Sequence, residues 1–255
     1  MEVNGVIGTG EGFPKAEQYA KRAIELDAEL PGSYSVLAIV QARNVSEEDT
    51  ERMHQKAVQV NPNYAPSWQR LSRFYWSKGQ FREAEAGLKR AQQLDPLSLM
   101  VNYNLGELYL IERNYQSSLD QAEHLFSIFP EHYGGYQIKA AALDGLGRYE
   151  EALQAAEKTQ ELNRDLYKAK ILAHMGRRDD ANELIARFEG SEAAKRPLTM
   201  ARLYAQIGDT EAGFKMLERA VVLRDTALSD INIDPDLDPL RADPRFQDIV
   251  AKIKL

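Results

Sequence analysis

Several residue types and patterns are absent from this sequence, and each absence excludes a class of protein. The 255 residues include no cysteine, which excludes a disulfide framework, a thiolate nucleophile and a cysteine zinc site. No apolar run reaches the ~18 residues that a membrane-spanning helix needs. The start, MEVNGVIGTGEG, lacks the basic region and apolar core of a signal peptide. Acidic residues outnumber basic ones, and a net charge of −7 argues against nucleic-acid binding. We expect neither membrane insertion nor nucleic-acid binding by this chain.

The sequence also lacks a recognisable catalytic motif. It has no G-x-G-x-x-G or G-x-x-x-x-G-K-[ST] pattern for phosphate and no H-E-x-x-H pattern for zinc. Its four histidines, His54, His124, His132 and His174, are scattered along the chain. We therefore predict a chain that is not an enzyme and needs no cofactor or metal. The alternative is an enzyme whose site is assembled from distant polar residues in the folded chain.

Residues 65–98, APSWQRLSRFYWSKGQFREAEAGLKRAQQLDPLS, predict a pair of helices. Two apolar stripes follow helical spacing, and their members are Trp68, Leu71, Ser72 and Tyr75, then Phe81, Ala84, Leu88 and Ala91. Gly79 separates the two stripes. Pro96 ends the second, because a residue before proline is pushed out of the α region. The small side chains of Ser72 and Ala84 mark where the two helices should touch.

Small residues recur at the same two places along most of the chain. In the second helix of each pair they are Ala16, Thr50, Ala84, Ser118, Ala152, Ala181 and Gly213, with spacings of 34, 34, 34, 34, 29 and 32. In the first helix they are Ala38, Ser72, Gly106, Ala140, Ala169 and Ala201. Two registers that coincide this often indicate one repeated helical hairpin.

The pattern W-x2-L-S-x2-Y, G-x-F-x2-A and A-x4-P within residues 65–98 resembles the tetratricopeptide (TPR) repeat. The resemblance implies an all-α fold, an α-solenoid wound as a right-handed superhelix. About six TPR hairpins would follow an N-terminal half-repeat and precede a C-terminal capping helix. The expected segments are a flexible leader at 1–12, a TPR array at 13–225 and a tail at 226–255. Within the array, the half-repeat is 13–30 and the hairpins are 31–64, 65–98, 99–132, 133–161, 162–190 and 192–225.

The two ends of the array depart from the repeat. The half-repeat at 13–30 is a second helix without its first, so we expect the natural protein to continue upstream; the alternative is a native amino terminus capped by a lone helix. The tail has Asp-Pro steps at 234–235, 238–239 and 243–244, followed by an apolar stripe. Aspartate caps helices and proline is tolerated in a first turn, so residues 243–254 are expected to form a helix that covers the last hairpin.

The tail and several repeat segments allow a closer resemblance. The quoted segments are NPNYA (61–65), LDPLSL (94–99), GRYEEAL (147–153), GRRDDA (176–181) and DPDLDPLRADPRFQDI (234–249). They are similar to the C-terminal TPR region of large bacterial signalling proteins and transcriptional regulators. The resemblance implies a missing upstream effector domain, such as a winged-helix, kinase or cyclase domain. It also implies a cytoplasmic location, or a periplasmic one as the soluble part of a membrane-anchored regulator.

The repeat geometry indicates where a partner would bind. First helices form the inner wall of a TPR superhelix. Within each first helix, the residues one and five positions after the one equivalent to Trp68 face inward. The next turn adds Trp76, Leu110, Asp144 and Gln206. The residues expected to line a partner-binding groove are Gln69, Arg73, Trp76, Tyr103, Glu107, Gln137, Lys170 and Arg202. An arginine and aromatics can anchor an extended peptide or partner helix. Alternatively, Trp76 and Tyr103 only pack between repeats.

These observations predict a non-catalytic scaffold or sensor module that binds a protein or peptide partner in a concave groove. The family's carboxylate clamp uses lysine and asparagine one repeat before the arginine. Here Ser35 and Ile39 occupy those places, so that clamp is not expected. The main alternative is an RNA-binding helical-repeat protein, which the acidic net charge disfavours.

Overall fold

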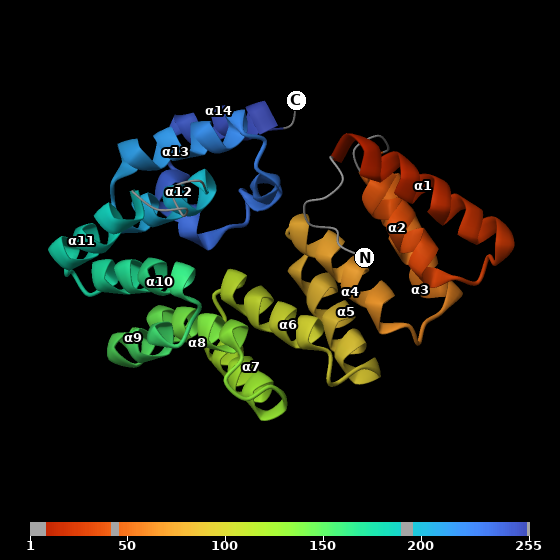
Figure 1. The fold of residues 1–255 in the computed structure, drawn as a ribbon, viewed down its shortest axis with the longest axis horizontal. Coiled ribbons are helices and arrows are strands. Elements are labelled where there is room, and N and C mark those ends of the chain that lie inside the picture. The colour runs from red at the N-terminus through yellow and green to blue at the C-terminus, as the bar shows by residue number, and fades with distance from the viewer. Residues whose placement is uncertain (1–8, 42–45, 190–195, 254–255) are drawn as a thin grey trace. The chain divides into compact units, whose positions relative to one another are not determined.

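The computed structural model describes residues 9–41, 46–189 and 196–253, and throughout these ranges the regular structure is helical (Figure 1). The all-α repeat fold is therefore confirmed. The chain divides into two compact units, Met1–Val101 and Asn102–Leu255, which are described separately below. Helix α6 (Leu99–Ile111) begins in unit 1 and lies mostly in unit 2.

Unit 1 contains a lone helix followed by two hairpins. Its helices are α1 (Thr9–Leu26), α2 (Pro31–Gln41), α3 (Glu47–Val60), α4 (Ala65–Ser77) and α5 (Phe81–Leu94). Helix α1 packs against α2, α2 pairs with α3, and α4 pairs with α5. Helix α3 has a side-chain N-cap, because the Ser46 hydroxyl accepts a hydrogen bond from the Asp49 amide at 3.1 Å.

The expected start of the half-repeat needs a correction. Helix α1 begins at Thr9, so residues 9–12, assigned from sequence to the flexible leader, are helical. The glycines in this stretch suggested a break, but a glycine within a helix costs only about 1 kcal/mol relative to alanine and does not forbid one. Residues 1–8 of the expected leader lie outside the described residues.

Helices α4 and α5 meet at the small side chains that the sequence pattern indicated. Ser72 and Ala84 are both fully buried. The approach is closest at Gly87, where an added Cβ would lie 2.2 Å from the Ser72 Oγ. Leu88 fills the adjacent space and is 1% exposed. The hairpin therefore depends on small residues at fixed places, as close-packed helix pairs do.

Unit 2 continues the same hairpin plan and ends in the tail. Its hairpins pair α6 with α7 (Tyr115–Ile128), α8 (Tyr133–Gly145) with α9 (Tyr149–Glu157), α10 (Glu161–His174) with α11 (Arg178–Glu189) and α12 (Pro197–Ile207) with α13 (Thr210–Val222). Residues 192–195, expected to open the last hairpin, lie outside the described residues. The first helices α8 and α12 both contact α10, so the first helices follow one another along one side of the unit.

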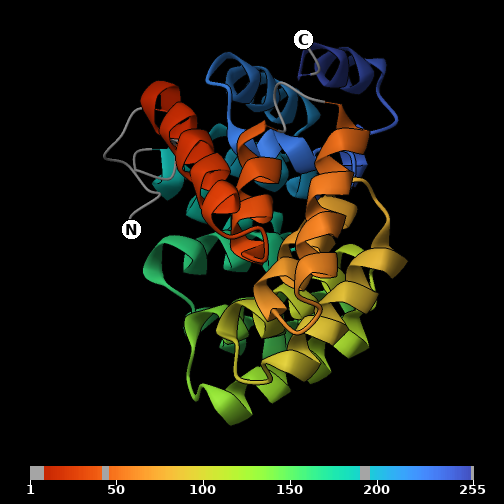
Figure 2. The same cartoon turned by 90° about the vertical axis from the view of Figure 1, so that its right-hand side faces the viewer.

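The tail folds back over the last hairpin. It consists of two 3₁₀ helices, η2 (Thr226–Asp230) and η3 (Pro235–Leu240), and the capping helix α14 (Pro244–Ile253). Helix α14 lies beside α13, as Figure 2 shows, and Phe246 and Ile249 are buried in one cluster with residues of α12 and α13. Leu237 and Leu240 of η3 belong to the same cluster and are fully buried. Each buried leucine stabilises this arrangement by about 1.5–3 kcal/mol.

Candidate functional site

The eight residues expected to line a groove are divided between the two units. Gln69, Arg73 and Trp76 lie on α4 in unit 1. The other five lie in unit 2 on first helices, and they are Tyr103 and Glu107 on α6, Gln137 on α8, Lys170 on α10 and Arg202 on α12.

In unit 1 the structure buries the central aromatic residue. Trp76 is only 4% exposed, and its indole N–H has no hydrogen-bond partner among the described residues. The Arg73 guanidinium lies 4.7 Å from the centroid of the Trp76 ring. A cation over an indole face at this distance is a favourable contact. Trp76 is thus a packed residue with one unsatisfied donor, and Arg73 is the exposed member of the pair.

In unit 2 the structure brings three of the expected residues together. The Tyr103 hydroxyl donates to Glu107 Oε1 at 2.9 Å and lies 3.4 Å from Gln137 Oε1. Tyr103 and Gln137 are 34 residues apart, so the repeat places equivalent positions of α6 and α8 side by side. Burial raises the pKa of Tyr103, and the nearby Glu107 charge raises it further. The hydroxyl therefore remains a hydrogen-bond donor at neutral pH.

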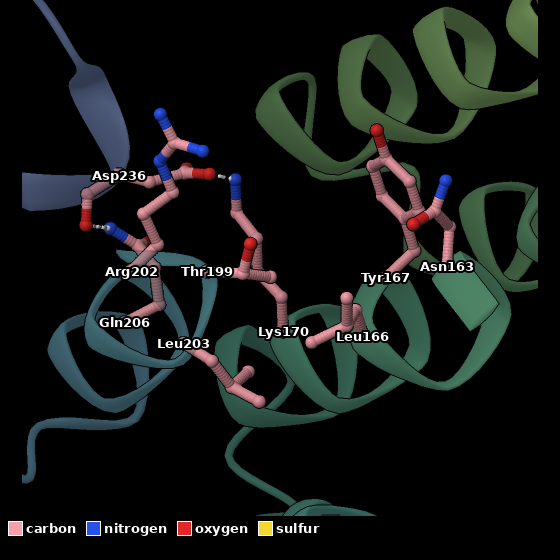
Figure 3. Close-up of a pocket in the computed structure, with 9 residues that line it drawn as sticks. All are labelled: Asn163, Leu166, Tyr167, Lys170, Thr199, Arg202, Leu203, Gln206 and Asp236. Atoms are coloured by element: carbon pink, nitrogen blue, oxygen red, sulfur yellow. Dashed lines mark hydrogen bonds and ion pairs between the residues drawn. The ribbon is translucent and has the colours of Figure 1, made fainter. Parts of the chain in front are cut away.

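The remaining two expected residues bind the chain's own tail. Lys170 forms an ion pair with Asp236, and the Arg202 Nε does so with Asp234. Figure 3 shows the Lys170 amino group pointing at the Asp236 carboxylate, while Gln206 turns toward the Asp236 backbone. The Gln206 amide donates to that carbonyl at 2.8 Å. Lys170 and Arg202 were expected to meet a partner, and instead each is paired with an aspartate of the tail.

Electrostatics favour the charged form of the Lys170–Asp236 pair. Burial opposes a charge on Lys170, but Asp236 and Asp144 outweigh that effect and raise the pKa of Lys170. Burial likewise opposes ionisation of Asp236, and Lys170 outweighs it and lowers the pKa of Asp236. Asp234 also accepts the Asp236 amide at 3.0 Å, which is the cap expected from the Asp-Pro step. Both aspartates therefore combine a turn role with an ion pair.

His174 and Asp144 join this network, although no motif or spacing in the sequence pairs them. His174 Nδ1 lies 2.8 Å from Asp144 Oδ1, and His174 Nε2 lies 2.9 Å from Gln206 Oε1. The side chain of Asp144 is 3% exposed. Asp144 and Gln206 occupy inward-facing places of their first helices, and that register was the one sequence signal available. The histidine itself carried no motif.

A pocket of about 210 Å³ opens beside the tail contact (Figure 3). Its lining residues come from α10, α12 and η3, and they are Asn163, Leu166, Tyr167, Lys170, Thr199, Arg202, Leu203, Gln206 and Asp236. Lys170 lies between Tyr167 and the tail in this view. Burial raises the pKa of Tyr167, so its hydroxyl also stays protonated. The pocket thus offers hydroxyl, amide and cationic hydrogen-bond donors beside the apolar side chains of Leu166 and Leu203.

We use the name first-helix face for the side of unit 2 formed by nine residues of α6, α8, α10 and α12. They are Tyr103, Glu107, Gln137, Asp144, Tyr167, Lys170, His174, Arg202 and Gln206. In the described ranges, no three histidine, aspartate or glutamate side chains gather where they could hold a metal ion. No helix of those ranges is long and apolar enough to cross a membrane. The face is a polar surface suited to hydrogen bonding and ion pairing.

Comparison with known proteins finds a family match on one hairpin. A family profile described as tetratricopeptide repeat matches residues 65–96. The BBSome complex member BBS4 from Bos taurus is 29% identical over 121 residues, which is 46% of this chain and 23% of that protein. The chain spans less than a quarter of the length of the curated relatives it matches.

Solved structures are similar in fold at low identity. A tetratricopeptide repeat protein from Parabacteroides merdae is 14% identical, with a TM-score of 0.67 over 95% of this chain and 91% of that one. YrrB, a TPR protein with an unusual peptide-binding site, is 14% identical, with a TM-score of 0.53 over 79% of this chain and 99% of its own. The chain therefore carries a tetratricopeptide repeat at residues 65–96 and has the all-helical repeat fold of the TPR proteins it resembles.

Proposed function

We propose that this chain is a non-catalytic protein-interaction scaffold that binds an extended peptide or a partner helix along the first-helix face of unit 2. The observation that carries the proposal is the tail itself. A short non-repeat segment, Asp234–Asp236, already lies against first helices and is held by Lys170, Arg202 and Gln206. Side chains of neighbouring first helices thus contact a backbone carbonyl and two carboxylates of the tail. An extended peptide can be held by contacts of the same kind.

The part of the face beyond the tail is the proposed partner surface. Tyr103, Glu107 and Gln137 are joined by hydrogen bonds, so the side chains are ordered before a partner arrives. Ordering in advance reduces the entropy that binding would otherwise lose. The peptide-binding site reported for YrrB, a protein of similar fold, supports the same use of the repeat.

We further infer that the scaffold serves a bacterial signalling or transcriptional regulator in the cytoplasm. The support for this step is the resemblance of the tail, DPDLDPLRADPRFQDI, to the ends of such TPR regions. An effector domain would then lie elsewhere in the same polypeptide or in a partner protein.

Site-specific photocrosslinking tests the proposed surface. A photoreactive amino acid would replace Gln137 on the first-helix face or Thr199 in the adjoining pocket, and Gln116 on α7 as a matched control. Gln116 is exposed and lies on a second helix. In source-cell lysate we expect one crosslinked partner, identified by mass spectrometry, from positions 137 and 199 and not from 116. Crosslinks of equal yield at all three positions, or only at 116, would overturn the proposal.

A further inference from the structure

His174 lies between two hydrogen-bond acceptors. Its Nδ1 faces the Asp144 carboxylate at 2.8 Å, and a carboxylate only accepts. Its Nε2 faces Gln206 Oε1 at 2.9 Å. The orientation of that amide is fixed, because its nitrogen donates to the Asp236 carbonyl at 2.8 Å. Both ring nitrogens must therefore donate, and a neutral imidazole has only one N–H.

The acidic groups around His174 also favour the protonated ring. Asp144 faces it from α8 and Asp236 lies nearby on η3, while Lys170, on its own helix, is the opposing cation. The neighbour on α12 is the neutral Gln206. The hydrogen bond that His174 donates to Asp144 raises the pKa of His174, against the opposing effects of burial and Lys170. These effects together favour the doubly protonated ring, which satisfies both acceptors.

We propose that His174 is a pH-dependent latch for the carboxyl-terminal tail, which holds Asp236 through Gln206 while the imidazole is doubly protonated. After loss of one proton, Nδ1–H still donates to Asp144, and the lone pair of Nε2 faces Gln206 Oε1. The amide must then turn its nitrogen toward Nε2, which directs its oxygen at the Asp236 carbonyl. Two acceptors cannot bond, so the hydrogen bond to the tail is lost.

The expected movement is confined to one segment. Leu237 and Leu240 are fully buried in the cluster with α12 and α13, and these contacts do not depend on His174. The Asp234–Asp236 segment lies before them and is held to α10 and α12 by two ion pairs and a hydrogen bond. Because Asp236 lines the pocket, release of the latch would alter one wall of that pocket. The latch itself requires no partner.

Hydrogen exchange measured by mass spectrometry on the full chain tests this latch. Exchange would be compared at pH 5.5 and 8.5 after correction for intrinsic rates. In the wild type we expect protection of the amides of residues 236–238 to fall roughly tenfold at the higher pH, the effect of losing one charge-assisted hydrogen-bond chain. His174→Gln should abolish this pH dependence. His124→Gln, the same change at an exposed histidine of α7, should retain it.

Two further measurements decide the outcome if His174→Gln does not fold. Gln206→Leu keeps the histidine but removes its link to the tail, and should leave residues 236–238 weakly protected at both pH values. NMR titration of the His174 ring should give a pKa above the ordinary value of about 6.5, and Asp144→Asn should lower it. A His174 pKa at or below the ordinary value, or an unchanged pH response in His174→Gln, would overturn the latch. If the expected pH response is observed but positions 137 and 199 give no crosslink, the latch stands and the proposed partner surface is wrong.

Discussion

The two units share one hairpin plan but treat their buried polar groups differently. In unit 1 four buried side-chain polar atoms have no hydrogen-bond partner among the described residues, namely Ser35 Oγ, His54 Nδ1, Ser67 Oγ and Trp76 Nε1. In unit 2 one such atom is found, Arg164 Nε. There the inward-facing polar residues Lys170, His174, Arg202 and Gln206 are paired with one another, with Asp144 or with the tail.

The difference shows how a uniform repeat acquires a specialised surface. A buried donor or acceptor without a partner costs about 1–3 kcal/mol, so polar residues inside a helix stack need groups supplied from elsewhere. In unit 2 the tail supplies them, with two aspartates and a backbone carbonyl. In the described part of unit 1 no comparable segment reaches these atoms. The tail is therefore both a cap for the last hairpin and a source of polar partners.

The largest expected effect comes from removing an apolar anchor of the tail. Leu240 is fully buried and lies close to Gly213 of α13. Leu240→Ala should lower the free energy of unfolding of unit 2 by about 2–5 kcal/mol, the usual range for a buried leucine. Both tryptophans, Trp68 and Trp76, lie in unit 1, so their fluorescence reports on that unit alone. In urea the circular dichroism transition should move to lower concentration, while the fluorescence midpoint stays in place.

A matched control is Leu223→Ala at the end of α13, where the side chain is 58% exposed. It should change the free energy of unfolding by no more than about 0.5 kcal/mol. Equal shifts of the two midpoints in Leu240→Ala would mean that the chain unfolds as one body. The units would then differ in how their buried polar groups are paired, but they would not unfold independently.

The second prediction concerns the opposite pH responses of two histidines. His54 in unit 1 is buried, and this burial lowers its pKa to about 4, with Arg70 adding to the effect. A lowered pKa contributes stability above the unfolded-state value, and that contribution is lost as the pH falls. Unit 1 should therefore lose up to about 3 kcal/mol between pH 7 and pH 4, measured by tryptophan fluorescence in urea. His174 has a raised pKa, so its contribution is present at low pH and is lost as the pH rises.

Replacing His54 should isolate its contribution to the acid response of unit 1. His54→Leu removes the buried titrating group and should flatten the acid response of unit 1, whereas His124→Leu, at an exposed site, should not. An acid response that persists in His54→Leu would assign it to other groups, and the two units would no longer differ in this respect.

The parts of this molecule that sequence predicts are those set by local spacing. Helical periodicity places Ser72 and Ala84 in the hairpin contact, and the last Asp-Pro step precedes the capping helix Pro244–Ile253, because each depends on residues a few positions apart. The pairing of Lys170 with Asp236 joins residues 66 apart and depends on where the tail folds back. No spacing rule contains that information. The ion pairs that Asp234 and Asp236 form with the first helices were therefore missed.

The smallest expected effect tests whether the two units share their hairpin packing. Ala84 in α5 and Ala152 in α9 hold the same place in the repeat, and both are fully buried. Ala84→Leu and Ala152→Leu should each overpack a helix contact and lower the free energy of unfolding by about 1–3 kcal/mol. Ala86→Leu, on the exposed side of α5, is the matched control and should change it by less than about 0.5 kcal/mol. Similar losses at 84 and 152 would leave the tail as the source of the difference between the units, whereas a loss at one site only would place that difference in the hairpins themselves.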